Sequence, residues 1–236
     1  MGENLLTVLK QGNKVKQVLT NHQNYQTGEL IGLESSGKHL LLGTFFSQVN
    51  DNLLIVTSNS VKADEMYEDL VRLLKTEQVL LFPKLEILPH ETLEIEETIK
   101  LERLEVFEKI FNDQPQVIIT PVQALLELVI PPDVYQDQLM TISLGQELDT
   151  AQFTSRLVTM GYERVGQVQN KGEFSVRGGI IDFYPYTADQ PVRLELFGEQ
   201  VDSLRYFEIS SQRSVNQLKK VVVGPATEFI LPEDLT

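Results

Sequence analysis

The segment VRLELFGEQVDSLRYF, residues 192–207, shows how the C-terminal part of this chain folds. Side chains along a strand point alternately to its two faces. Leu194 and Leu196 therefore fall on one face, and Arg193, Glu195 and Phe197 fall on the other. Residues 201–207 form a second strand candidate after a short polar turn. We therefore expect two neighbouring antiparallel strands whose leucine face is turned toward a core.

The sequence around this pair carries the signals of an α+β domain. A helix is expected over residues 149–160, and the following residue, Gly161, ends it. Turn residues separate three further strand candidates, at residues 164–168, 174–177 and 180–184. This spacing is typical of antiparallel meanders rather than of crossover connections. We place the domain at residues 132–220, so that its boundary falls within the dipeptide Pro131-Pro132.

Residues 28–131 follow a different pattern, in which strand candidates alternate with helix candidates. The strands are expected at residues 30–33, 53–57, 79–82 and 117–119, and the helices at residues 39–49, 60–74, 96–111 and 122–129. Such alternation predicts parallel strands joined by crossover helices, and so a doubly wound α/β layer. Short apolar stretches in residues 1–27 predict a helical N-terminal preamble. Residues 221–236 are expected to begin a further segment.

The composition is that of a globular protein with an acidic balance. Of the 236 residues, 42% are hydrophobic and 23% are charged, and the net charge is −14. This charge argues against broad binding to nucleic acid, which depends on an excess of Lys and Arg. The chain has no cysteine, its three histidines are scattered, and no apolar run is long enough to span a membrane. We expect no metal site, no membrane partner and a cytoplasmic location.

A near match to a phosphate-binding loop precedes the helix expected at residues 39–49. Gly32, Gly37 and Lys38 fit the pattern G-x-x-x-x-G-K, but His39 stands where Ser or Thr is required. The missing hydroxyl normally ligates magnesium, for which imidazole is a poor substitute. Glu34 also brings a carboxylate to the place of the phosphate. We interpret the segment as a degenerate loop rather than as an active nucleotide site.

The stretch from residue 91 to residue 109 is rich in glutamate. Paired carboxylates are able to bind a metal or to serve as acid and base. Here, however, Glu97 with Arg103 and Glu105 with Lys109 alternate with apolar residues. The favoured interpretation is a solvated helix face.

Arg193 and Phe197 share the polar face of the predicted sheet with a second arginine. In FSVR, residues 174–177, the alternation places Arg177 on that face and Val176 on the opposite one. Arginines beside an aromatic side chain are typical of protein-interaction hot spots. The alternative is a cross-strand pair of Arg and Glu, with Phe197 covered by a loop. The pattern alone leaves both interpretations open.

The motifs of the second domain closely resemble those of the transcription-repair coupling factors. They are GEFSVRGGIIDFYP (172–185), PVRLELFGEQVDSLRYF (191–207) and SQRS (211–214). The resemblance covers most of the chain and is to the N-terminal module of that family, which is itself similar to the excision-repair protein UvrB. Two departures separate the chain from UvrB. The phosphate loop ends in G-K-H, and residues 82–97 are short and lack Tyr and Trp where UvrB carries a long aromatic-rich hairpin.

The resemblance implies a P-loop-helicase-like fold for residues 28–131, without an active nucleotide site, and a smaller α+β domain that docks on UvrA. The family's UvrA-binding residues fall on Arg177, Arg193 and Phe197. Because these side chains lie opposite the leucine face, we expect their loss to affect binding rather than stability. The full-length protein would be an ATP-driven DNA translocase that contacts RNA polymerase and DNA through domains absent here. No cofactor is expected in this chain, since ATP and magnesium belong to those motor domains.

The resemblance therefore implies a non-catalytic adaptor that recruits UvrA to lesions where RNA polymerase has stalled, in transcription-coupled nucleotide excision repair. Two alternatives remain. One is a nucleotide hydrolase that uses residues 32–39, and the other is a UvrB-like module that binds damaged DNA. His39 weighs against the first alternative, and the net charge and the missing hairpin weigh against the second.

Overall fold

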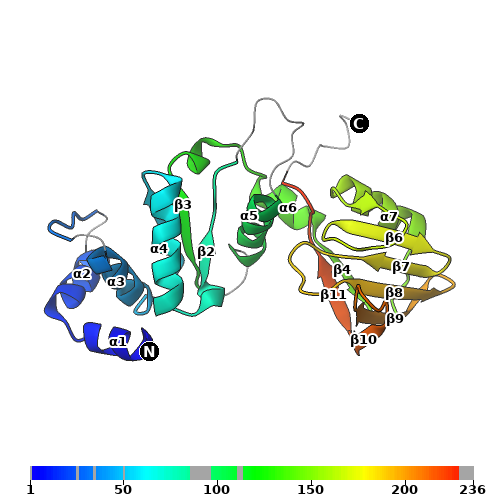
Figure 1. Ribbon diagram of the computed structural model, residues 1–236, viewed down its shortest axis with the longest axis horizontal. Helices are drawn as coiled ribbons and strands as arrows, with labels where there is room; N and C mark the ends of the chain where they lie inside the picture. Colours follow the sequence, from blue (N-terminus) through cyan, green and yellow to red (C-terminus); the bar gives the residue numbers. More distant parts are fainter. Residues whose placement is uncertain are drawn as a thin grey trace. The chain divides into compact units, whose positions relative to one another are not determined.

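The chain divides into two compact units, Met1–Glu127 and Leu128–Thr236. The computed structural model, drawn in Figure 1, describes residues 2–24, 27–33, 36–49, 51–85, 97–110 and 114–228. The division falls just before Pro131-Pro132, where the pattern of the sequence changes from alternating strands and helices to successive strands.

A parallel sheet of three strands lies at the centre of the first unit. The strand order is β1-β3-β2, and β3 pairs in parallel with both neighbours. The strands are β1 (Leu53–Thr57), β2 (Val79–Leu81) and β3 (Val117–Pro121). All five residues of β3 are buried, as expected for a central strand that is covered on both faces.

Helices lie on both sides of this sheet (Figure 1). Helix α4 (Ser60–Leu73) packs on the face that carries Ile55 and Ile119. Helix α5 (Glu97–Ile110) packs on the face that carries Leu80 and Ile118. Neighbouring residues of β3 enter different clusters because successive side chains of a strand point to opposite faces.

Two short helices, α1 (Gly2–Leu9) and α2 (Asn13–Asn24), lie in residues 1–27, as expected for the preamble. Helix α3 (Ser36–Phe46) overlaps the helix expected at residues 39–49. The 3₁₀ turn η1 (Thr76–Gln78) follows α4. The strand expected at residues 30–33 is wrong, since these residues form no strand. Leu30 and Ile31 are exposed, so the short apolar run that suggested a buried strand is not part of a core.

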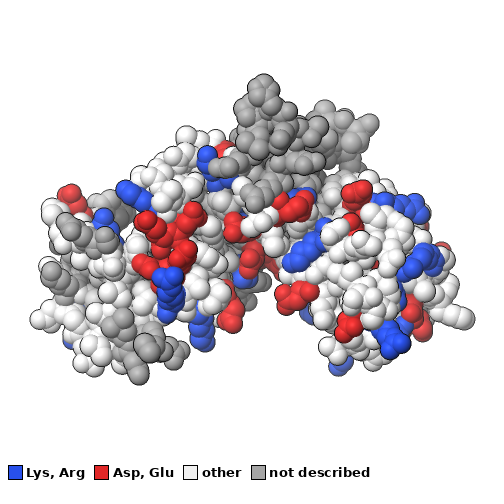
Figure 2. Space-filling view, in the orientation of Figure 1, with Lys and Arg blue, Asp and Glu red and all other residues white. Residues whose placement is uncertain are grey.

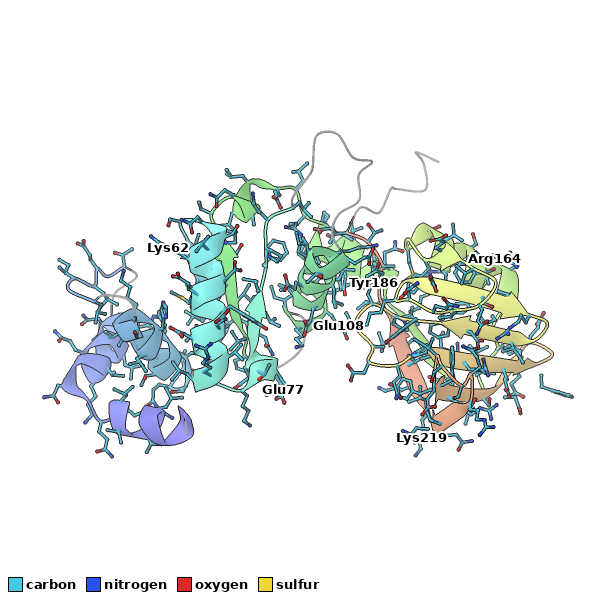
Figure 3. The ribbon with its side chains drawn as sticks, in the orientation of Figure 1. Lys62, Glu77, Glu108, Arg164, Tyr186 and Lys219 are labelled. Atoms are coloured by element: carbon cyan, nitrogen blue, oxygen red, sulfur yellow. The ribbon has the colours of Figure 1, made fainter. Side chains whose placement is uncertain are left out.

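The second unit is built on a six-stranded sheet of order β10-β9-β8-β7-β6-β5. Neighbours from β6 to β9 are antiparallel, as predicted. Strand β10, which was not expected from the sequence, is antiparallel to β9, and β5 is parallel to β6. The strands are β5 (Glu163–Arg164), β6 (Glu173–Arg177), β7 (Ile180–Phe183), β8 (Val192–Phe197), β9 (Gln200–Phe207) and β10 (Ser214–Gln217). Arg164, labelled in Figure 3, marks the β5 edge.

Helix α7 (Thr150–Thr159) lies within one residue, at each end, of the helix expected at residues 149–160. The side chain of Asp149 caps its N-terminus by accepting hydrogen bonds from the amides of Ala151 and Gln152. Gly161 ends it with a backbone φ of +87°, a left-handed conformation that favours glycine. The helix covers one face of the six-stranded sheet, where the rings of Phe153 and Phe183 meet edge to face with centroids 5.8 Å apart.

A separate two-stranded sheet joins the two ends of this unit. Strand β4 (Met140–Ser143), which follows α6 (Pro132–Gln138), pairs antiparallel with β11 (Lys220–Val223). The boundary expected after residue 220 therefore falls inside β11, and Val221 to Val223 belong to the second unit.

The helix expected at residues 122–129 is also wrong. Only the 3₁₀ turn η2 (Ala124–Leu126) forms there. Leu126 and Leu128 are exposed, so no buried apolar face stabilises a longer helix in this segment.

The described residues thus form a parallel α/β layer in one unit and an antiparallel sheet with helices in the other. Within the described ranges, no helix is long and apolar enough to cross a lipid bilayer.

Candidate functional site

One face of the six-stranded sheet carries a row of polar side chains, and we call it the outer face. The strand register aligns Asp182 on β7 with Arg193 on β8 and with Ser175 on β6, and it aligns Arg193 with Arg205 on β9. The opposite, inner face belongs to the core, and its fully buried residues include Phe174, Ile181, Leu194 and Leu204.

Asp182 lies at the centre of this row, and only 1% of its side chain is exposed. Its carboxylate accepts three hydrogen bonds from arginines. Arg193 donates from Nε to Oδ1 at 2.7 Å and from Nη2 to Oδ2 at 2.8 Å, and Arg177 donates from Nη2 to Oδ2 at 2.6 Å. These bonds offset the loss of hydration that a buried carboxylate suffers.

Arg193 is held within the second unit by contacts around its whole guanidinium group. Its Nη1 donates to the backbone oxygen of Gln212 at 3.0 Å, and its Cζ lies 4.6 Å from the centroid of the Phe207 ring. The hydrogen bond with Asp182 raises the pKa of Arg193. Only 14% of the side chain is exposed. In contrast to the expectation from the sequence, we expect the loss of Arg193 to lower stability, because Asp182 would lose its main partner.

Arg177 is more accessible, with 50% of its side chain exposed. It ends β6 just before the turn at Gly178-Gly179, where Gly178 has a φ of +62°. The amide of Leu196 donates to the oxygen of Gly179 at 2.8 Å, so this turn lies against the end of β8. Among the described residues, Asp182 is the hydrogen-bond partner of Arg177 and occupies only its Nη2. Its Nε and Nη1 are available to a partner.

Phe197 is the last residue of β8, and 82% of it is exposed. Arg177, Ile180 and Glu195 are aligned across three strands, and Phe197 lies two residues beyond Glu195 on the same face. The spacing between strands and the rise along β8 therefore separate the Cα atoms of Phe197 and Arg177 by about 12 Å. Within the part of the chain that the structure describes, no loop covers Phe197, in contrast to the alternative interpretation of the sequence.

The cross-strand pair of Arg and Glu does exist, between Arg205 and Glu195. Glu195 also accepts a hydrogen bond from the hydroxyl of Ser203 at 3.1 Å. Neither Asp182 nor Arg205 was identified as a site residue from the sequence. The available signal was a single Asp within the apolar run IIDF (180–183), but its partners depend on the register of three strands.

The comparisons with known proteins concern both this sheet and the chain as a whole. Residues 140–229, which include the whole six-stranded sheet, match the family described as the UvrB interaction domain. The second unit resembles a UvrB interaction domain.

The resemblance extends to nearly the whole chain. Over 98% of its length, the chain is 34% identical to the transcription-repair-coupling factor of Bacillus subtilis (strain 168) and 31% identical to that of Staphylococcus aureus (strain Mu50 / ATCC 700699). The chain spans about a fifth of the length of these curated relatives (20%). The resemblance to the transcription-repair coupling factors that the motifs indicated is confirmed.

The phosphate-loop residues lie in the first unit, at the start of α3. Gly32 and Lys38 are exposed, and Nδ1 of His39 lies 2.6 Å from Oδ2 of Asp69 on α4. Glu34 lies outside the described residues. Because residues 27–33, which the structure describes, form no strand, the strand–loop–helix context of a phosphate site is incomplete.

A hollow of about 640 Å³ lies beside this loop, between α3, β1 and α4. Lys38 and Lys62 line it, and so do three carboxylates of α4, Glu65, Glu68 and Asp69. Lys62 is labelled on α4 in Figure 3, and Figure 2 shows the acidic side chains that gather over this helix. Such carboxylates repel a polyphosphate rather than attract it.

The glutamate-rich stretch is partly a solvated helix face. On α5, Glu108 is exposed (Figure 3), and Nζ of Lys109 lies 2.5 Å from Oε1 of Glu105. Residues 91, 94 and 96 lie outside the described ranges. The placement of Arg103 on the solvated face is wrong, because Arg103 is fully buried and pairs with Glu127 at 2.7 Å.

Proposed function

We propose that this chain is a non-catalytic adaptor that binds UvrA through the outer face of its second unit, in transcription-coupled nucleotide excision repair. The observation that supports this most directly is the exposure of Phe197 on the face that carries the half-exposed Arg177. The match to the UvrB interaction domain covers the same sheet.

The two side chains supply different parts of a docking site. Phe197 offers a large apolar surface that a partner pocket is able to bury, and aromatic anchors of this kind dominate many interfaces. Arg177 offers guanidinium nitrogens to a partner carboxylate. Its hydrogen bond to Asp182 holds the Arg177 side chain in position. The strands behind them are rigid elements of a packed sheet, so the site needs little ordering on binding.

Titration of the purified chain against UvrA tests the proposal. We expect Phe197→Ala to weaken binding at least ~30-fold, and Arg177→Ala at least ~10-fold, as for buried anchors and charge partners at interfaces. The melting temperatures of both variants should stay close to that of the parent chain, because both side chains are largely outside the core.

Val158→Ala is the matched control, since Val158 is an exposed apolar residue of α7, which covers the inner face of the sheet. Its affinity for UvrA should equal that of the parent chain. Equal affinities for Phe197→Ala and Val158→Ala would show that the outer face does not dock UvrA.

We infer that the first unit is a helicase-like fold that has lost its nucleotide site. In support, His39 replaces the magnesium-binding hydroxyl and is engaged by Asp69. We expect no tight binding of magnesium ATP in a calorimetric titration, and no ATP hydrolysis, either by the parent chain or by His39→Thr. Magnesium-dependent binding at micromolar ATP would contradict this inference.

The full-length protein, of which this chain would be a part, is proposed to be an ATP-driven DNA translocase of the cytoplasm. Its contacts with RNA polymerase and DNA would be made by other domains, which would also hold ATP and magnesium. This proposal rests on the similarity of the chain to the transcription-repair-coupling factors.

A further inference from the structure

We propose that the docking face offers a single cation, Arg177, to a single carboxylate of the partner, and that Arg193 is a positioning residue that acts through Asp182. This inference rests on the proposed function. It differs from the expectation that Arg177 and Arg193 each meet a carboxylate of UvrA.

The hydrogen bonds of Arg193 leave none of its guanidinium nitrogens without an acceptor in the second unit. All three of its guanidinium nitrogens have acceptors within the second unit, namely both oxygens of Asp182 and the backbone oxygen of Gln212. One flat face of the group lies over the Phe207 ring. A partner carboxylate would have to displace contacts to a buried anion, which costs more than the new pair returns.

The net charge of Asp182 and its two arginines limits the number of partner carboxylates that the face is able to pair. Asp182 and the two arginines together carry one net positive charge, and Asp182 and Arg193 are nearly buried while Arg177 is half exposed. The excess charge is therefore presented at Arg177. One partner carboxylate neutralises it, whereas a second would leave an unpaired negative charge in the interface.

The shared acceptor explains how Arg193 affects a partner that it does not touch. Oδ2 of Asp182 accepts from both arginines, at 2.8 Å from Arg193 and 2.6 Å from Arg177. If Arg193 is removed, Asp182 is left with Arg177 as its single ion-pair partner. The attraction then draws the Arg177 guanidinium inward, away from the partner carboxylate.

The test is a set of three variants of this chain, each titrated against UvrA beside the parent. They are Arg177→Gln, Arg193→Gln and the double variant that combines Arg193→Gln with Asp182→Asn. The double variant removes the buried anion and its counter-ion together, so it should fold even where Arg193→Gln does not. We expect Arg177→Gln and Arg193→Gln each to weaken binding at least ~10-fold, and the double variant to lose less than ~5-fold. A Lys219→Gln variant controls for the loss of one exposed positive charge and should bind like the parent.

The salt dependence of the association rate separates a direct contact between Arg193 and the partner from an indirect effect through Asp182. Removal of an exposed interface charge flattens this dependence, whereas removal of a buried pair does not. We expect a flatter dependence for Arg177→Gln and an unchanged one for the double variant.

The outcomes separate this inference from the proposed function. If the double variant loses as much affinity as Arg177→Gln, Arg193 contacts the partner directly and the inference is overturned. If the parent chain itself does not bind UvrA, the proposed function fails, and the inference fails with it.

Discussion

Arg193→Ala is expected to lower the free energy of unfolding of the second unit by ~3–5 kcal/mol, the usual cost of breaking a buried ion pair from one side. The reason is the carboxylate of Asp182, which is 1% exposed and takes two of its three arginine hydrogen bonds from Arg193. Scanning calorimetry should show a melting temperature at least ~10 °C lower for this unit. Hydrogen exchange of the β7 and β8 amides should accelerate.

Arg177→Ala is the control within the same cluster. Arg177 contributes one hydrogen bond to Asp182 and is half exposed, so its loss should cost no more than ~1 kcal/mol. Equal melting temperatures for Arg193→Ala and the parent chain would show that Asp182 does not depend on Arg193.

Arg103→Ala is expected to destabilise the first unit by a similar ~3–5 kcal/mol. The Arg103 side chain is fully buried, and its Nη1 donates to the backbone oxygen of Pro83 and to Oε2 of Glu127, both at 2.7 Å. Its guanidinium also lies 4.1 Å from the centroid of the Phe82 ring. Truncation leaves a cavity and removes these partners at once, which urea unfolding would detect as a lower midpoint.

Arg72→Ala provides a matched comparison for this prediction, because Arg72 is also an arginine on a helix of the first unit. It is exposed and pairs with Glu68 at 3.1 Å and with Asp69 at 3.3 Å. Exposed pairs of this kind contribute ~0–1 kcal/mol. Identical unfolding midpoints for the Arg103 and Arg72 variants would refute the role assigned to Arg103.

The burial of Arg103 could not be predicted from the residue pattern of α5. Its neighbours in the sequence are glutamates and apolar residues at helical spacing, which indicates an amphipathic helix but not the depth of each charged residue. The partners Pro83 and Glu127 lie 20 and 24 residues away in sequence. Their approach depends on how α5 packs against the sheet.

Local signals did predict most of the second unit. The alternation of residues 192–197 gave the faces of β8, and the stop at Gly161 gave the end of α7. These predictions succeeded because strand alternation and helix capping depend on residues close together in the chain. Segments 30–33 and 122–129 failed because a short apolar run is ambiguous until a partner surface buries it.

The sequence by itself predicted a parallel α/β layer followed by an antiparallel sheet, and it placed Arg177, Arg193 and Phe197 on one face of that sheet. Only the tertiary structure decided that Phe197 stays uncovered, that Arg177 is half exposed and that Arg193 is held by Asp182. The physical reason is that the exposure and pairing of a charged side chain depend on strand register and on the loops packed over the sheet. Those contacts join residues that are distant in the sequence, and a buried carboxylate such as Asp182 selects its arginine only once the strands have paired.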